Sequence, residues 1–217
     1  MKRTLLFILC ALIIWGCGGS IIPKAPPIEY HQLNYSYHGI TPLSCSAIQD
    51  KVLKVWSFHA ASPFDSTEMV VESGNFQVSV SRSHQWIDRP GTLLAEWIRK
   101  DIDRDGMFSG AYETIETSGK MIGMELSGVV ERWSWVNTEK GYYAVMEVTI
   151  TVWQKQPKAS ILFKKHYEMK SQPVSTNNPE AFAQKITELT EQLSKTFRKE
   201  LYEILAKELC HGSKAEH

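Results

Sequence analysis

The sequence predicts a single α+β domain, in which two helices pack on one face of a mostly antiparallel or mixed sheet. Several stretches alternate apolar with polar residues, which is typical of strands that bury one face. Two longer stretches repeat apolar residues at helical spacing. Groups of strands and two helices in this order indicate the α+β class, and the other face of the sheet would be partly open or would face a partner.

Residues 1–16 have the features of an export signal. Lys2 and Arg3 precede an apolar run that is too short to span a membrane comfortably. Residues 14–17, IWGC, have the pattern of a bacterial lipobox, in which Cys17 is the residue that receives lipid. Because Gly18 rather than an aspartate follows the cysteine, we expect a lipid anchor on the periplasmic side of the outer membrane. The alternatives are an ordinary signal peptide or a poor membrane anchor with a chance cysteine.

The rest of the chain divides into a tether, one domain and a tail. Residues 17–29 contain the lipidated cysteine and a stretch rich in Gly and Pro, which we interpret as a flexible tether. Residues 30–210 form the domain, and 211–217 a short C-terminal tail. Without Lys2 and Arg3, 22 basic residues stand beside 24 acidic ones, and no basic run is present. Nucleic acid is therefore not an expected partner, because phosphate binding needs clustered Lys and Arg.

The strands and helices can be placed along the chain. A helix is expected to open at Pro90 and to end at Gly106, and a second, long helix to begin at Asn178, which is a good N-cap before a proline. Its apolar face runs to Ile204. The last three strands, separated by short turns, predict an antiparallel meander. The expected strands are 30–37, 52–58, 69–71, 76–81, 108–115, 122–131, 144–152 and 161–169.

Two cysteines remain once the signal and the anchor are accounted for. Cys10 leaves with the signal and Cys17 is used by lipid, so Cys45 and Cys210 are candidates for one disulfide in an oxidising periplasm. This bond would tie the start of the domain to the end of its last helix. The alternative is a pair of free, buried thiols.

The stretch 101–113, DIDRDGMFSGAYE, begins like a calcium-binding loop. Asp101, Asp103 and Asp105 precede Gly106, which has the place of the glycine in an EF-hand. The twelfth position, however, is Tyr112 and not the glutamate that closes the cage. We interpret the stretch as a charged helix end and a turn, and predict no calcium site.

No other metal, cofactor or catalytic site is predicted. His59, His84 and His166 are too far apart for any familiar metal-ligand spacing. The sequence has neither a G-x-S-x-G nucleophile elbow nor a phosphate-binding loop. We therefore do not expect an enzyme.

Aromatic residues near the turn at 137–141 suggest a contact surface. Trp133 and Trp135 are expected to lie opposite the apolar core face of their strand, with Tyr143 across the turn. The simpler interpretation is a cross-strand aromatic pairing that stabilises the hairpin.

The stretch 81–108, SRSHQWIDRPGTLLAEWIRKDIDRDGMF, resembles the ABC-type transport auxiliary lipoproteins, which include the lipoprotein of the paraquat-inducible transport system. In that family a strand leads to a tryptophan, a proline, a helix with paired aliphatic residues and a glycine-phenylalanine turn. The family has only a helix end and turn where this chain has its aspartates, so the resemblance implies that they decorate the surface. The matching residues are Trp86, Pro90, Leu93, Leu94, Trp97, Gly106 and Phe108.

The resemblance implies a non-catalytic docking role in a transport system that moves lipids or other hydrophobic substrates across the envelope. The implied partners are a transporter permease complex and a substrate-binding protein of the mammalian-cell-entry type, and self-association stays open. The alternative is a lipid carrier or chaperone with an internal cavity. Bulky residues at core positions, such as Met124, Met146 and Phe163, favour a filled core and therefore docking.

Overall fold

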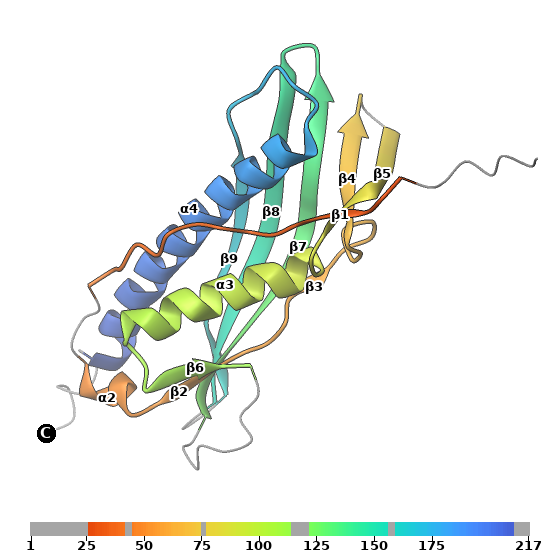
Figure 1. The fold of residues 1–217 in the computed structure, drawn as a ribbon. Coiled ribbons are helices and arrows are strands. Elements are labelled where there is room, and N and C mark those ends of the chain that lie inside the picture. The colour runs from red at the N-terminus through yellow and green to blue at the C-terminus, as the bar shows by residue number, and fades with distance from the viewer. Residues whose placement is uncertain (1–25, 42–44, 75–76, 114–121, 156–158, 211–217) are drawn as a thin grey trace, which may run out of the picture.

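The structure is a computed structural model that describes residues 26–41, 45–74, 77–113, 122–155 and 159–210 (Figure 1). The predicted α+β class is confirmed: a nine-stranded mixed sheet carries both long helices on one face. In chain order the elements are β1 Glu29–His31, α2 Ser46–Gln49, β2 Val52–Val55, β3 His59–Ala60, β4 Glu68–Ser73, β5 Gln77–Trp86, α3 Pro90–Asp105, β6 Gly110–Tyr112, β7 Ile122–Thr138, β8 Gly141–Gln154, β9 Ser160–Lys170, α4 Pro179–Leu205 and η1 Ala206–Cys210.

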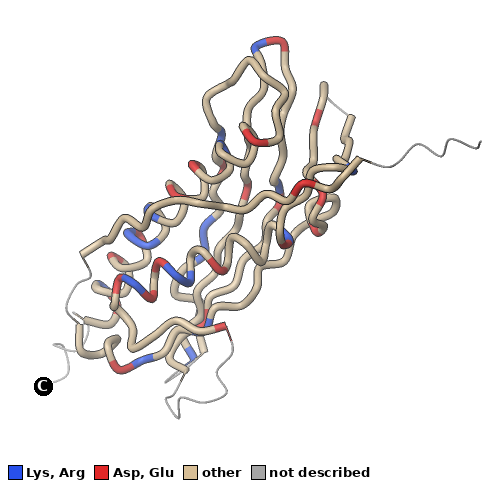
Figure 2. The backbone as a smooth tube through the Cα atoms, viewed as in Figure 1, with Lys and Arg blue, Asp and Glu red and all other residues tan. Residues whose placement is uncertain are grey.

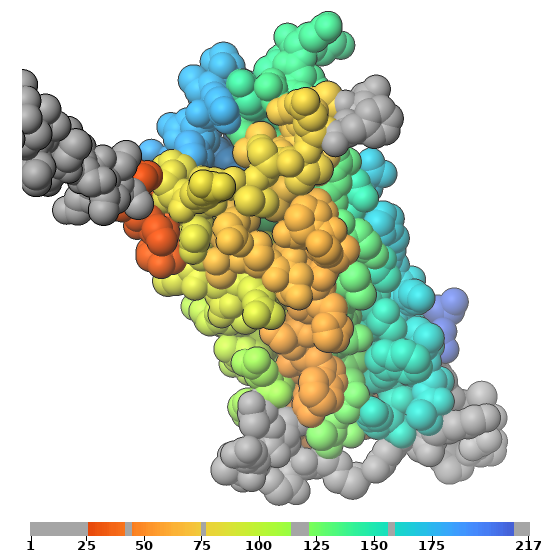
Figure 3. All heavy atoms as spheres, turned by 90° about the vertical axis from the view of Figure 1, so that its right-hand side faces the viewer, coloured from red at the N-terminus to blue at the C-terminus, as the bar shows by residue number. Residues whose placement is uncertain are grey.

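The 17-residue strand β7 organises the sheet. Along one edge it pairs in parallel with β2, β3 and β4 in turn, and β8 pairs antiparallel with it. Figure 3 shows the orange segment that contains these three short strands running along one side of the molecule. Beyond them, β6 extends the sheet from β2, while β5 and β1 extend it from β4. The parallel pairs make the sheet mixed.

The predicted antiparallel meander is present as β7, β8 and β9. In β8 the residues that alternate are buried, as period-two spacing requires when helices cover only one face. They are Ala144, Met146, Val148, Ile150 and Val152, each fully buried.

The helices α3 and α4 form the second layer. Gly91 lets α3 approach the chain after β2, because a Cβ there would lie 2.2 Å from the carbonyl oxygen of Phe58. Gly106 ends α3 with a φ of 68°, a left-handed conformation that favours glycine. The side chain of Asn178 caps α4 by accepting a hydrogen bond from the amide of Glu180, as the sequence predicts.

The first segment of the domain differs from its prediction. Only Glu29–His31 forms a strand, and residues 32–40 run across the outside of α3 and α4 (Figure 1). We call residues 32–40 the crossing segment. Leu33 is buried, and the ring of Tyr35 lies 4.5 Å from that of Trp97 on α3. The alternation of polar and aromatic residues here therefore reflects contact with helices rather than pairing in a sheet.

Candidate functional site

The predicted lipid attachment residue, Cys17, lies outside the described residues, as do the signal and most of the tether. Within the described part of the chain, every helix is too short or too polar to serve as a membrane span. The described part of the chain begins at residue 26, just before β1.

Cys45 and Cys210 are joined in a disulfide, with their Cα atoms 5.8 Å apart. Cys45 precedes the short helix α2, and Cys210 ends η1, which continues α4. The bond therefore fastens the C-terminal end of the helical layer to the chain that leads into β2.

The predicted surface position of the aspartates is wrong for two of the three. Asp101 and Asp105 are 0% and 8% exposed, whereas Asp103 is exposed and accepts a hydrogen bond from the amide of Ala111. The signal was available in the sequence, because Asp101 and Asp105 share a helical face with Leu94 and Ile98. Two of the three carboxylates therefore face the interior and one faces solvent. A calcium-binding loop would instead direct all three toward one ion.

Asp105 is the centre of a buried polar network between α3, α4 and the crossing segment. Both its carboxylate oxygens accept from Nη1 of Arg198 at 2.7 Å. Tyr37 and Tyr202 donate their hydroxyl hydrogens to it at 2.6 and 2.7 Å, and the amide of Ile40 adds a bond at 3.2 Å. The carboxylate is therefore fully satisfied by groups far away in the sequence.

Asp101 extends the network by one helical turn. One of its oxygens accepts from Tyr35 at 2.8 Å and from Ser194 at 2.6 Å, and lies 3.7 Å from Nη2 of Arg198. The same guanidinium nitrogen donates to the carbonyl of His38 at 3.0 Å. Arg198, itself 1% exposed, thereby links both aspartates to the crossing segment.

The network keeps its donors protonated. Burial, then the bond to Asp105, raises the pKa of Tyr37 to about 12. Burial and Asp105 raise the pKa of Tyr202 as well. Burial opposes the charge on Arg198, but Asp105 and Asp101 outweigh it and raise the pKa of the guanidinium. All three groups can therefore donate hydrogen bonds to the carboxylates at neutral pH, and the network holds α3, α4 and the crossing segment together.

Trp133 and Trp135, predicted to face away from the core, are buried at 1% exposed each. The pairing of β7 with β8 shifts between Val130 and Arg132, where a β-bulge adds one residue to β7. An extra residue turns the following side chains to the opposite face. The alternation that buries Val130 therefore gives way to one that buries Trp133 and Trp135.

These tryptophans belong to an aromatic cluster in the core. Phe182 of α4 contacts Trp86 and Trp135, with ring centroids at 5.4 and 5.3 Å. Trp86 meets Trp133 edge to face at 5.8 Å, and Tyr142 lies across from Trp135 at 5.9 Å. The indole nitrogens of the three tryptophans are buried without a hydrogen-bond acceptor among the described residues. These tryptophans therefore stabilise the fold through packing and not through hydrogen bonds of their indole nitrogens.

We expect Trp133→Ala to lower the free energy of unfolding by about 3–5 kcal/mol, because it leaves a cavity in this cluster. Trp133→Phe should cost clearly less, since a phenyl ring keeps most of the buried area and no indole hydrogen bond is lost. Urea unfolding measures both, with exposed Trp56→Ala as the control. Equal losses for Trp133→Ala and Trp56→Ala would contradict the buried position.

An exposed apolar row does lie on the open face of the sheet, at other positions. The outer row comprises Trp56, Val129, Trp153 and Ile161, which are 44%, 40%, 39% and 48% exposed. Trp153 pairs with Ile161 on β9 and with Glu125 on β7, and Glu125 accepts a bond from the indole of Trp56 at 3.3 Å. Trp56, Trp153 and Ile161 therefore lie at the end of the sheet farthest from the β7–β8 turn, and Val129 lies on the same face midway along β7. Trp153 could have been found from the alternation that defines the core face of β8. Ile161 could not, because it has the same spacing as buried Phe163, and only the register shift in the β8–β9 pairing at Val152 and Trp153 turns it to the open face.

The third residue of the predicted contact surface, Tyr143, is half-buried. The ammonium group of Lys170 lies 3.5 Å from the centre of its ring. Tyr143 borders an open groove of about 520 Å³ with Thr138 and Pro173. Tyr143 pairs with Val136, next to the pair of Trp135 with Ala144, so it points to the opposite face of the sheet from Trp135. Its position near the β7–β8 turn also separates it from the tryptophans of the outer row.

The surface shows mixed charge. Basic and acidic residues alternate along the helices and strands in Figure 2. On the open face, Arg132 binds Glu72 at 2.9 Å and Glu147 at 3.2 Å. Next to the outer row, Lys155 pairs with Glu125 at 3.1 Å, and the ammonium group of Lys54 lies 3.4 Å from the centre of the Trp56 ring.

The comparisons with known proteins show similarity of fold. No family model and no curated protein matches the chain. A crystal structure from Xanthomonas campestris, described under the family model DUF330, matches with a TM-score of 0.66 at 13% identity, covering 83% of this chain and 97% of that one. A hypothetical protein from Chlamydia trachomatis matches with a TM-score of 0.50 at 7% identity, covering 72% and 98%.

Lipoproteins also occur among the solved structures that match. Lipoprotein GNA1162 from Neisseria meningitidis matches with a TM-score of 0.26 at 7% identity, covering 66% of this chain and 96% of that one. Such a score carries no argument about this chain. What the higher-scoring matches establish is that nearly the whole of two other bacterial proteins has the arrangement of strands and helices described above.

Proposed function

We propose that this protein is an outer-membrane lipoprotein that docks components of an envelope transport system and carries out no chemistry itself. Cys17 would hold it on the periplasmic side, and the tether would set its reach. The observation that carries the proposal is the outer row on the open face of the sheet. Tryptophan in such a position is enriched at protein interfaces, where its large ring is desolvated on binding.

The filled core supports docking over the carrier alternative. Met124, Leu126 and Ile150 have no exposed surface, and α4 packs directly on the meander, with the Phe197 ring 5.5 Å from that of Phe163. The larger hollows, such as the groove of about 520 Å³ beside Tyr143, are open to solvent, and the more enclosed pocket beside Val55 has a volume of only about 50 Å³. Ligand pockets usually measure roughly 300–1,000 Å³.

The charges beside the outer row favour a protein partner. The ammonium group of Lys54 lies over the Trp56 ring, and Glu125, which lies between Trp56 and Trp153, pairs with Lys155. Such a mixture of apolar and charged groups is usual at non-obligate protein interfaces, which are about as apolar as the rest of a protein surface. The partner class, a transporter permease complex or its substrate-binding protein, follows from the resemblance to the ABC-type auxiliary lipoproteins.

Affinity capture of the full chain from crosslinked cells tests the proposal. We expect the chain to recover a permease, ATPase or substrate-binding component, and Trp56→Ser with Trp153→Ser to lower that recovery at least about 10-fold. Val78→Ser with Val80→Ser is the matched control, because these valines are 55% and 49% exposed on β5. Mass spectrometry of the exported chain should find acyl groups on Cys17.

Two results would count against this function. Recovery of no envelope transport component by the unaltered chain would overturn the docking role. Stoichiometric lipid released by solvent extraction of the purified protein would favour the carrier instead.

A further inference from the structure

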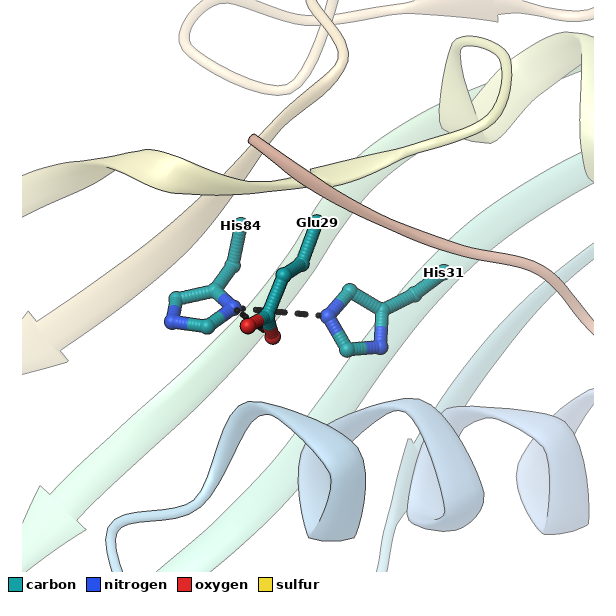
Figure 4. A group of neighbouring side chains, drawn as sticks. All are labelled: Glu29, His31 and His84. Carbon is teal, nitrogen blue, oxygen red and sulfur yellow. Dashed lines mark hydrogen bonds and ion pairs between the residues drawn. The ribbon is translucent and has the colours of Figure 1, made fainter. Parts of the chain in front are cut away.

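A second group of polar side chains lies at the sheet edge where the chain enters the domain. Glu29 and His31 come from β1 and His84 from β5, and the three side chains converge in Figure 4. The two strands pair in parallel, with Glu29 opposite His84. Glu29 and His31, two residues apart on β1, share one face of the sheet. The register therefore brings His84 next to Glu29 and next to His31, which precedes it by 53 positions in the sequence.

The distances between the ligand atoms of these three side chains suit a bound metal ion. Nδ1 of His84 lies 3.3 Å from a carboxylate oxygen of Glu29 and 3.5 Å from Nε2 of His31. All three ligand atoms lie within 4.8 Å of one another. Four ligands at the usual zinc bond lengths are separated from one another by roughly 3.3–3.4 Å in a tetrahedron. The distances from Nδ1 of His84 to Glu29 and to His31 are therefore already close to the ligand separations around a bound zinc ion.

The surroundings leave room for the ion and for a further ligand. Glu29, His31 and His84 border an open pocket of about 310 Å³ together with Asn178 and Glu180, at the start of α4. The helix N-terminus carries partial positive charge, which opposes a cation. Glu180 lies in the first turn of α4, and its negative charge offsets the partial positive charge of the helix N-terminus. Its carboxylate or a water molecule could serve as the fourth ligand of the ion.

We propose that Glu29, His31 and His84 form a binding site for a divalent cation of the zinc class. Two imidazoles and one carboxylate are a ligand set that zinc and neighbouring transition metals accept. The ion would fasten β1 to β5. Because β1 pairs over only three residues and directly follows the tether, the site would strengthen the place where a pull from the lipid anchor reaches the domain. This role rests on the proposed anchor at Cys17, whereas binding of the cation depends on neither the anchor nor docking.

The test uses the full chain without an affinity tag, purified in detergent and stripped with EDTA. Calorimetric titration with zinc chloride should give one site per chain that depends on these residues. His31→Ala and His84→Ala should each weaken it more than about 100-fold, since loss of even an indirect supporting group costs roughly 10–100-fold. His59→Ala, which removes an exposed histidine on β3, should leave the affinity unchanged.

A second readout separates the site from general loss of structure. Cobalt(II) chloride added to the stripped protein should produce the visible absorption of a tetrahedral ion, and both histidine variants should lose it while keeping the circular dichroism of the parent chain. Absence of a stoichiometric site would overturn the proposal, and so would binding that survives both substitutions. In either case the cluster is a metal-free ion pair and hydrogen bond.

Discussion

Replacing Asp105 with alanine is expected to lower the free energy of unfolding by about 3–5 kcal/mol, the usual consequence of removing one partner from a buried ion pair. The guanidinium of Arg198, 1% exposed, would lose both bonds at 2.7 Å and keep its charge in the interior. The hydroxyls of Tyr37 and Tyr202 would lose their acceptor as well. Urea denaturation, followed by circular dichroism, measures the change.

Asp103→Ala is the matched control on the same helix. Its side chain is exposed and accepts one backbone hydrogen bond, so the loss should be about 0.5–1.5 kcal/mol. The double variant Asp105→Ala with Arg198→Ala should cost less than the sum of the single changes, because it removes the buried guanidinium that Asp105→Ala by itself leaves without this partner. Similar losses for Asp103→Ala and Asp105→Ala would refute the buried network.

Reduction of the disulfide between Cys45 and Cys210 is the second change with a large expected effect. The bond closes a loop across 165 residues of sequence, and the chain-entropy model assigns roughly 4–5 kcal/mol to a loop of that size. The urea midpoint should therefore fall sharply in the presence of a reductant. Because reduction mainly increases the conformational freedom of the unfolded chain, the circular dichroism spectrum of the folded protein should change little.

The variant Cys45→Ser with Cys210→Ser distinguishes the disulfide from other effects of the reductant. It should unfold at the midpoint of the reduced parent, and added reductant should leave it there. If the oxidised and reduced parent chains unfolded at the same urea concentration, the disulfide would contribute nothing to stability.

The aspartates show how a local pattern can be correct and its interpretation incomplete. The sequence places Asp101 and Asp105 at a helix end, and α3 ends at Asp105. Their burial depends on Arg198 and Tyr202, more than 90 residues later. Helical spacing puts both aspartates on the apolar face, but it does not reveal which distant group neutralises them.

The tryptophans show a different limit. Alternation predicts the faces of β8 correctly because the extra residue at the register shift belongs to β7, and β8 continues without one. In β7 the bulge before Arg132 exchanges the two faces. A bulge depends on how two strands pair, so the alternation of β7 by itself assigned Trp133 and Trp135 to the wrong side.

The types and order of most elements were determined by the sequence alone, because helical and strand spacing are local properties that burial on one face imposes. The capped start of α4, the antiparallel meander and the one pair of cysteines left for a disulfide belong to this class. Tertiary structure alone decided the parallel pairing along β7, the path of residues 32–40 across the helices, and the meeting of His31 with His84. These depend on contacts between segments far apart in the chain, and the spacing of residues within one segment carries no record of its partner.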